Sequence, residues 1–165
     1  MLKVGPIWCN GTTWDHRGKT DIAQIFISRC EKRINFIQFV YCEDGGNKLV
    51  LSEKIGGDGD SGSLWLDSVT FDYPSEYITR VSGKYENIYS TKYLRSITFD
   101  TNRGRYGPFE AAPAKDSLED TEFRYEVGRS KFGGFFGAFT STGINSIGIY
   151  VKPLEKLVIT PVKEE

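Results

Sequence analysis

The chain has 165 residues, and its 21 lysines and arginines nearly balance its 22 aspartates and glutamates. This length predicts one domain that buries a real core. The near-neutral charge gives no reason to expect a nucleic-acid or membrane-surface partner. No stretch is apolar for long enough to span a bilayer.

The three cysteines, Cys9, Cys30 and Cys42, are odd in number and lack the spacing of metal ligands. A disulfide scaffold would leave one thiol over, so the sequence predicts reduced cysteines. The first residues also lack the apolar run of a signal peptide. Together these features predict a cytoplasmic or nuclear protein.

Short segments rich in β-branched and aromatic residues follow one another along the chain, with the period of two that is typical of strands. They predict strands at 23–28, 34–41, 48–51, 68–72, 77–82, 94–100, 123–127 and 146–152. No window keeps a helical period, and Pro113 favours a loop in the stretch 111–120. The sequence therefore predicts an all-β domain, as a sandwich, a barrel or a prism.

The segment 133–151 joins a glycine-aromatic strand to an apolar strand through a short polar loop. The loop contains the hydroxyls of Thr140, Ser141 and Thr142, and Gly143 and Asn145 follow them. Glycines allow a ligand to approach the backbone closely. This cluster of neutral hydrogen-bonding groups suits a polyhydroxylated ligand.

Four segments, 5–15, 77–83, 95–109 and 133–151, together resemble the jacalin-related plant lectins in the right order over residues 3 to 153. In this comparison, segment 77–83 is similar to the central strand of the family, ending in a glycine turn. The resemblance implies a β-prism of three four-stranded Greek-key sheets around a pseudo-threefold axis. It implies sugar binding at one end of the prism, without a metal, a cofactor or catalysis. We assign residues 1–153 to the lectin domain and 154–165 to a C-terminal tail.

In mannose-binding members of the family, the sugar lies between a first-loop glycine, matched here by Gly11, and a Gly-x-x-x-Asp loop. That loop matches residues 141–145, so Ser141 replaces the glycine and Asn145 replaces the aspartate. A neutral amide forms weaker hydrogen bonds than a carboxylate, and the loss is roughly 1–3 kcal/mol. Backbone donors at Thr142 and Gly143 do not depend on side-chain identity. The resemblance thus implies weakened binding of mannose- or glucose-type glycans.

Two tyrosines, Tyr85 and Tyr89, fall in the polar stretch 84–92 between two predicted strands and are candidates for a specificity loop. Packing over the prism end is the alternative for both. Asn145 is equally interpreted as a turn residue that begins a strand, and Gly11 as a residue required by turn geometry.

Other conspicuous residues have structural interpretations. Trp8, Trp14 and Trp65 are expected to pack in the core or against strands rather than to stack on a sugar. The only histidine, His16, has no nucleophile motif beside it, so a surface or hydrogen-bonded structural role is expected. Residues 58–62 resemble the start of a calcium loop but lack the later acidic ligands, which favours a hairpin turn.

An enzyme is disfavoured, because no recognisable pair of catalytic acids is present. Two other functions remain open. One is a mannose-specific lectin in plant defence, because the chain runs unbroken into Gly11, whereas galactose-binding members are cleaved there. The other is a jacalin-like protein-interaction module in defence or virus restriction that has lost sugar binding. An exposed edge strand would permit a homo-oligomer in either case.

Overall fold

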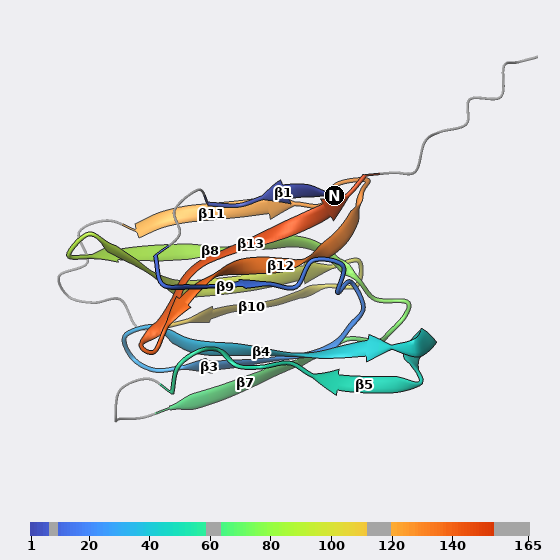
Figure 1. Ribbon diagram of the computed structural model, residues 1–165, viewed down its shortest axis with the longest axis horizontal. Coiled ribbons are helices and arrows are strands. Elements are labelled where there is room, and N and C mark those ends of the chain that lie inside the picture. The colour runs from blue at the N-terminus through green and yellow to red at the C-terminus, as the bar shows by residue number, and fades with distance from the viewer. Residues whose placement is uncertain (7–9, 59–63, 112–119, 154–165) are drawn as a thin grey trace, which may run out of the picture.

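The computed structural model describes residues 1–6, 10–58, 64–111 and 120–153. Within these residues the chain forms thirteen strands and one 3-10 turn, η1 (Asp44–Gly46), and no α-helix. The strands build three antiparallel sheets around a common core (Figure 1). Trp8, Cys9, most of the predicted loops at 58–62 and 111–120, and the predicted tail lie outside the described residues.

Sheet A is built from both ends of the chain, in the order β1 (Leu2–Val4), β13 (Gly143–Lys152), β12 (Lys131–Thr140) and β2 (Thr12–Asp15). Sheet B has the order β5 (Lys48–Leu51), β4 (Ile34–Glu43), β3 (Ile22–Arg29) and β7 (Trp65–Thr70), and β6 (Ile55–Gly56) also pairs with β4. Sheet C has the order β10 (Arg105–Glu110), β9 (Thr91–Thr101), β8 (Ile78–Ile88) and β11 (Asp120–Glu126).

Sheets B and C share one topology. In each, three consecutive strands pair as hairpins and the last strand of the sheet, β7 or β11, returns beside the first, which is the Greek-key pattern. Sheet A repeats the pattern, with β1 taking the third place beside β13. The prism predicted from the resemblance is therefore present, but sheet B has five strands rather than four.

Each sheet contributes a phenylalanine to the centre of the core. Phe39 of β4, Phe99 of β9 and Phe135 of β12 are all fully buried. The ring of Phe135 stacks on Phe39 at 4.9 Å between centroids and meets Phe99 edge-on at 6.2 Å. These contacts join the three sheets about their common axis.

The pairing register slips once in the second strand of the first hairpin of each sheet. The residue pairs on either side leave one extra residue, which is Asn35 in β4, Arg95 in β9 and Asn145 in β13. An extra residue of this kind is a β-bulge, which redirects its side chain. All three are polar and buried, so the threefold repetition extends to the bulges.

All eight predicted strands are found, but the glycine turn expected at Gly83 is wrong. Gly83 lies in the middle of β8, where it pairs with Ile97 and Phe123. A Cβ atom there would come within 2.1 Å of the Ser96 carbonyl oxygen. The glycine therefore serves close packing inside a strand, and β8 continues to Ile88.

Trp14 is buried in the core, as expected. Trp65 is 43% exposed on edge strand β7, where it lies beneath Arg29 rather than in the core. His16 has the hydrogen-bonded structural role. Its Nδ1 lies 2.6 Å from the Tyr41 hydroxyl and its Nε2 lies 2.8 Å from Glu53 Oε1. It thereby ties sheet A to sheet B.

Both described cysteines, Cys30 and Cys42, carry free thiols. Burial raises the pKa of the Cys42 thiol, and the nearby Asp21 carboxylate adds to this. Within the described ranges, no helix has the length and apolar character needed to cross a membrane.

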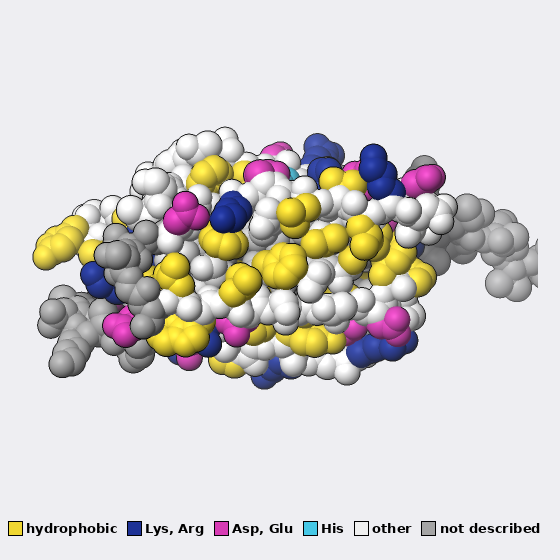
Figure 2. Space-filling model, turned by 90° about the horizontal axis from the view of Figure 1, so that it is seen from below, with side chains coloured by type: hydrophobic (Ala, Val, Ile, Leu, Met, Phe, Trp, Pro, Cys, Tyr) yellow, Lys and Arg dark blue, Asp and Glu magenta, His cyan; other side chains and the backbone are white. Residues whose placement is uncertain are grey.

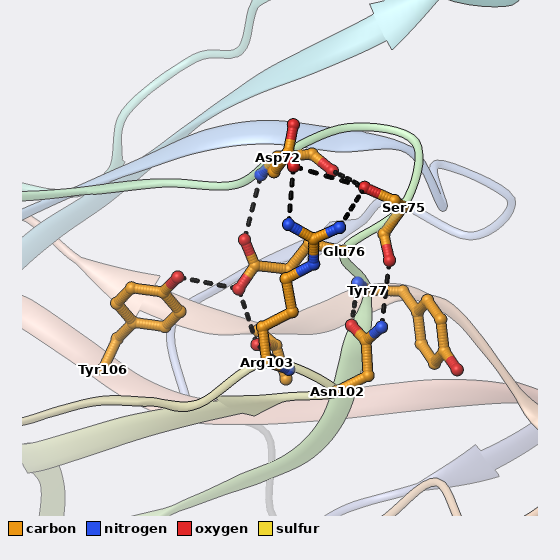
Figure 3. Close-up of polar contacts among 8 residues, drawn as sticks. Asp72, Ser75, Glu76, Tyr77, Asn102, Arg103 and Tyr106 are labelled. Atoms are coloured by element: carbon orange, nitrogen blue, oxygen red, sulfur yellow. Dashed lines mark hydrogen bonds and ion pairs between the residues drawn. The ribbon is translucent and has the colours of Figure 1, made fainter.

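A buried carboxylate organises one end of the prism, which we call the far end (Figure 3). Glu76, in the loop between β7 and β8, accepts hydrogen bonds from the Asp72 amide at 2.9 Å, the Thr101 hydroxyl at 2.6 Å and the Tyr106 hydroxyl at 2.7 Å. Burial alone would raise the pKa of Glu76, but these three donors and Arg103 together hold it below its usual value. Arg103 also binds Asp72 and Ser75.

Candidate functional site

Three hairpin turns, β3–β4, β8–β9 and β12–β13, meet at the opposite end of the prism, which we call the hairpin end (Figure 1, left). Strand β8 runs from the far end to the hairpin end over 11 residues, which corresponds to about 33 Å. The candidate sugar-binding residues belong to the hairpin end.

The β12–β13 turn presents a small hydroxyl surface. Thr140 pairs with Gly143, so Ser141 and Thr142 form the exposed tip. The hydroxyls of Thr140 and Thr142 lie 3.0 Å apart, and the Thr142 amide points at the Thr140 hydroxyl at 3.4 Å. Among the described residues, this amide therefore has only a long contact, which a ligand oxygen could replace.

The structure brings Gly11 to the same turn. Its φ of +99° belongs to the region that favours glycine. A Cβ atom at Gly11 would lie 2.4 Å from the Phe139 carbonyl oxygen and 3.0 Å from the Thr140 side chain. The packing of the first loop against β12 is thus sufficient reason for a glycine here. Its exposure also leaves it open to a ligand.

Asn145 is buried rather than presented to solvent, with 1% of its surface exposed. From its bulge in β13, the side-chain Nδ2 donates a hydrogen bond to the Lys92 carbonyl oxygen in β9 at 2.9 Å. Its amide therefore links sheet A to sheet C. This contact supports the structural interpretation of Asn145. The residue does not lie in a turn, however, but in the bulge of β13.

Arg33, in the β3–β4 turn, was not singled out from the sequence. Its guanidinium lies over the Tyr93 ring of β9 at 4.3 Å and its Nη1 donates to the Thr142 carbonyl oxygen at 3.4 Å. One side chain from the sheet B hairpin thus contacts both other sheets beside the candidate turn. Gly57 was also missed as a neighbour of this turn: a Cβ atom there would overlap the Ser141 carbonyl oxygen at 1.8 Å. Sequence reasoning missed Arg33 and Gly57 because each contacts the turn from a segment that is distant in sequence.

The two tyrosines of the predicted specificity loop have different environments. Tyr89 is 99% exposed at the tip of the β8–β9 hairpin. The expectation that Tyr85 lies in an exposed loop is wrong, because it is fully buried in β8. Its hydroxyl accepts from the Ile147 amide at 3.0 Å and donates to the Ile147 carbonyl at 3.1 Å. Burial raises the pKa of this phenol far above its usual value.

The chemistry of the hairpin end is that of reversible binding. Hydroxyls, a backbone amide and an exposed aromatic ring can hydrogen-bond and stack on a sugar. In the part of the chain that the structure describes, no group of three or more His, Cys, Asp or Glu side chains could hold a metal ion. Three Greek-key sheets with a polar turn at one end define a β-prism of the lectin class.

Comparison with known proteins identifies the family. The family model described as Jacalin-like lectin domain matches residues 5–150, and the chain belongs to this family. Protein RESTRICTED TEV MOVEMENT 1 of Arabidopsis thaliana is 37% identical over 162 residues, covering 92% of this chain and 87% of that protein. Jacalin-related lectin 2 of Arabidopsis thaliana is 31% identical and covers 92% and 86%.

Solved structures agree with this assignment. AcmJRL, a mannose-binding jacalin-related lectin from Ananas comosus, superposes with a TM-score of 0.69 at 30% identity and covers 93% of this chain and 96% of that one. Single-chain recombinant jacalin superposes with a TM-score of 0.71 at 25% identity and covers 93% of each chain. The expected β-prism is confirmed. Family and fold are those of carbohydrate-binding proteins rather than enzymes.

Proposed function

We propose that this protein is a weak, mannose- or glucose-type lectin of plant defence whose sugar lies between Gly11 and the β12–β13 turn. The observation that carries the proposal is the long contact of the Thr142 amide, beside an exposed glycine. A sugar hydroxyl that replaced the Thr140 hydroxyl would give this amide a shorter hydrogen bond.

The affinity is weakened by Asn145. The family's aspartate would offer a charged acceptor, whereas Asn145 is neutral and its amide is engaged by the Lys92 carbonyl. Loss of two charge-assisted hydrogen bonds costs roughly 1–3 kcal/mol. An affinity in the millimolar range leaves only about 4 kcal/mol in total, so the remaining backbone donors set the strength of binding.

The test is a titration of the labelled protein with methyl mannoside, glucose, galactose and a mannose-rich glycan, followed by the amide resonances. Saturable shifts at Gly11, Thr142 and Gly143 are expected with mannose and glucose but not with galactose. Thr142→Tyr, which crowds the exposed turn, should abolish them. Thr70→Tyr, at an exposed position on sheet B, is the matched control.

A protein-interaction module without sugar binding is the second candidate. It is favoured by the 37% identity to a protein whose name refers to restricted TEV movement, and by Tyr89, whose exposed ring suits a protein contact. No shift at the hairpin end with any of the four sugars would exclude the lectin and leave this candidate. Association of copies through an edge strand is compatible with either candidate and would appear as a concentration-dependent mass in light scattering.

A further inference from the structure

The outer face of sheet C carries side chains aligned in three rows across its four strands. The pairing register places Arg105, Asp100, Arg80 and Glu126 in the first row, Thr98, Ser82 and Arg124 in the second, and Glu110, Ser96, Lys84 and Glu122 in the third. The outer face of sheet B is different: in the view from below, its middle carries hydrophobic side chains among uncharged atoms, and most charged side chains lie toward its margins (Figure 2). The outer faces of sheets B and C therefore differ in their pattern of charge.

The middle row is hollow over β9 and β8 because its side chains there are short. Between β9 and β8 it holds only Thr98 and Ser82, and on β10 the irregular segment at Pro108 interrupts the pairing. Thr98 and its neighbour Ser96 are just 8% and 3% exposed, so they lie at the bottom of the depression. The hollow has a volume of about 410 Å³, which is within the range of small-ligand sites.

The first row and its neighbour Arg124 leave guanidinium groups available. Arg105 binds Asp100 through Nε at 2.8 Å, and Arg124 binds Glu126 through Nε at 2.8 Å. Both arginine side chains are 61% exposed, and their Nη atoms form no hydrogen bond with another described residue. They rise from the two edge strands, on opposite sides of the hollow. Arg80 shares the same two carboxylates, so three cations face two anions.

In the third row the carboxylates outnumber the cations. Lys84 stands between Glu110 and Glu122, and its Nζ is 3.8 Å from Glu110 Oε1. Two carboxylates against one cation leave oxygens that can accept hydrogen bonds from hydroxyl groups. Lys84 is four positions along β8 from Arg80 of the first row, a distance of about 13 Å.

We infer that this hollow binds a short acidic oligosaccharide, with a uronate carboxylate between Arg105 and Arg124 and neutral sugar hydroxyls toward Glu110 and Glu122. Arginine recognises a carboxylate with paired, charge-assisted hydrogen bonds. The hydroxyls of Ser82, Ser96 and Thr98 bind the ring between the two ends. A polyanion is disfavoured because the third row would repel it. This site is independent of the hairpin turn and does not rest on the sugar binding proposed there.

The experiment compares a disaccharide of glucuronic acid and a neutral hexose with the neutral disaccharide of the same linkage. Calorimetry and amide shifts should give saturable binding of the acid, at least about tenfold tighter than the neutral sugar. The shifts should map to Ser82, Gly83 and Thr98. Raising the ionic strength from about 0.02 M to about 0.5 M should weaken binding, because these groups are solvent-exposed.

Variants locate the site. Arg105→Gln and Arg124→Gln should each weaken binding of the acidic disaccharide about tenfold, while the melting temperature stays near that of the wild type because both side chains are exposed. Arg129→Gln, an equal change of charge at an exposed position outside the hollow, and Thr142→Tyr should leave binding unchanged. Equal affinity for both disaccharides, unaffected binding in the two arginine variants, or shifts confined to the hairpin end would each overturn the inference.

Discussion

At the far end of the prism the carboxylate of Glu76 is buried and accepts three hydrogen bonds, whereas at the hairpin end Ser141, Thr142 and Tyr89 are exposed. Both ends are rich in polar residues, so composition does not distinguish them. They differ in whether the polar groups are engaged with one another. At the far end the polar groups bind one another and stabilise the fold. At the hairpin end exposed polar groups can still bind a ligand. Substitutions at the two ends should therefore have different consequences.

The largest effect on stability is expected at the far end. Glu76→Ala removes the acceptor of three donors in a buried setting and should lower the free energy of unfolding by about 3 kcal/mol. Glu76→Gln keeps the size and one acceptor oxygen, so its cost should be smaller. Urea unfolding at pH 7 measures both. A loss below about 0.5 kcal/mol in Glu76→Ala would remove the contrast between the ends.

Acid should weaken the same end. The pKa of Glu76 is lowered in the folded protein, so its stabilising contribution is complete above the unfolded value of about 4.3 and is lost as the pH falls through the folded value. The stability gap between wild type and Glu76→Gln should therefore narrow below about pH 4.3. Urea midpoints of the two proteins from pH 7 to pH 3 give this gap directly. A gap that widens in acid would contradict the assignment.

Asn145→Asp tests whether the hairpin end contains a structural residue of its own. A carboxylate cannot donate to the Lys92 carbonyl oxygen and would face it at the present distance of 2.9 Å. We expect a loss of about 2 kcal/mol in the free energy of unfolding, measured at pH 7. Asn145→Ala is the control for loss of the hydrogen bond without repulsion. Equal stability of Asn145→Asp and wild type would mean that the side chain is free to turn toward a ligand.

The smallest effect, and the only gain, is expected at Tyr89. Tyr89 and Ser90 have φ values of 48° and 68° at the β8–β9 turn, where Asn and Gly are favoured. Tyr89→Asn should raise the free energy of unfolding by about 0.5 kcal/mol. Thermal melts measure the gain. If the variant also loses binding of a sugar or protein, the tyrosine is retained for contact rather than for folding.

Alternation of apolar and polar residues was sufficient to predict the long strands, because one face of each strand packs on the core. The alternation failed to predict strands that have no long alternating run. Strand β1 has only three residues, and β10 contains Gly107 and Pro108, so neither has a run of sufficient length. Gly83 suggests a turn from sequence alone, and only the approach of the Ser96 carbonyl explains it as a strand residue.

The sequence predicted part of the candidate site, as it predicted part of the fold. The resemblance brought Gly11 and residues 141–145 together, and the structure places them at one end. The continuation of β8 beyond Gly83 was not recognised in the sequence, so the burial of Tyr85 in that strand was missed. Arg33 had no local signal, because its contacts with Tyr93 and Thr142 join three sheets. Sequence patterns report neighbours along the chain better than neighbours across it.

Sheet A is closed by the pairing of β1 with β13, in which Leu2 lies opposite Val151. The two strands are antiparallel and their outer ends are adjacent. A force applied to Leu2 and Lys152 would therefore peel this three-residue ladder one hydrogen bond at a time instead of shearing it. Sheets B and C, whose strands are joined by hairpins, carry no load at that stage. Under tension β1 should therefore leave the edge of sheet A first, while β13, β12 and β2 stay paired.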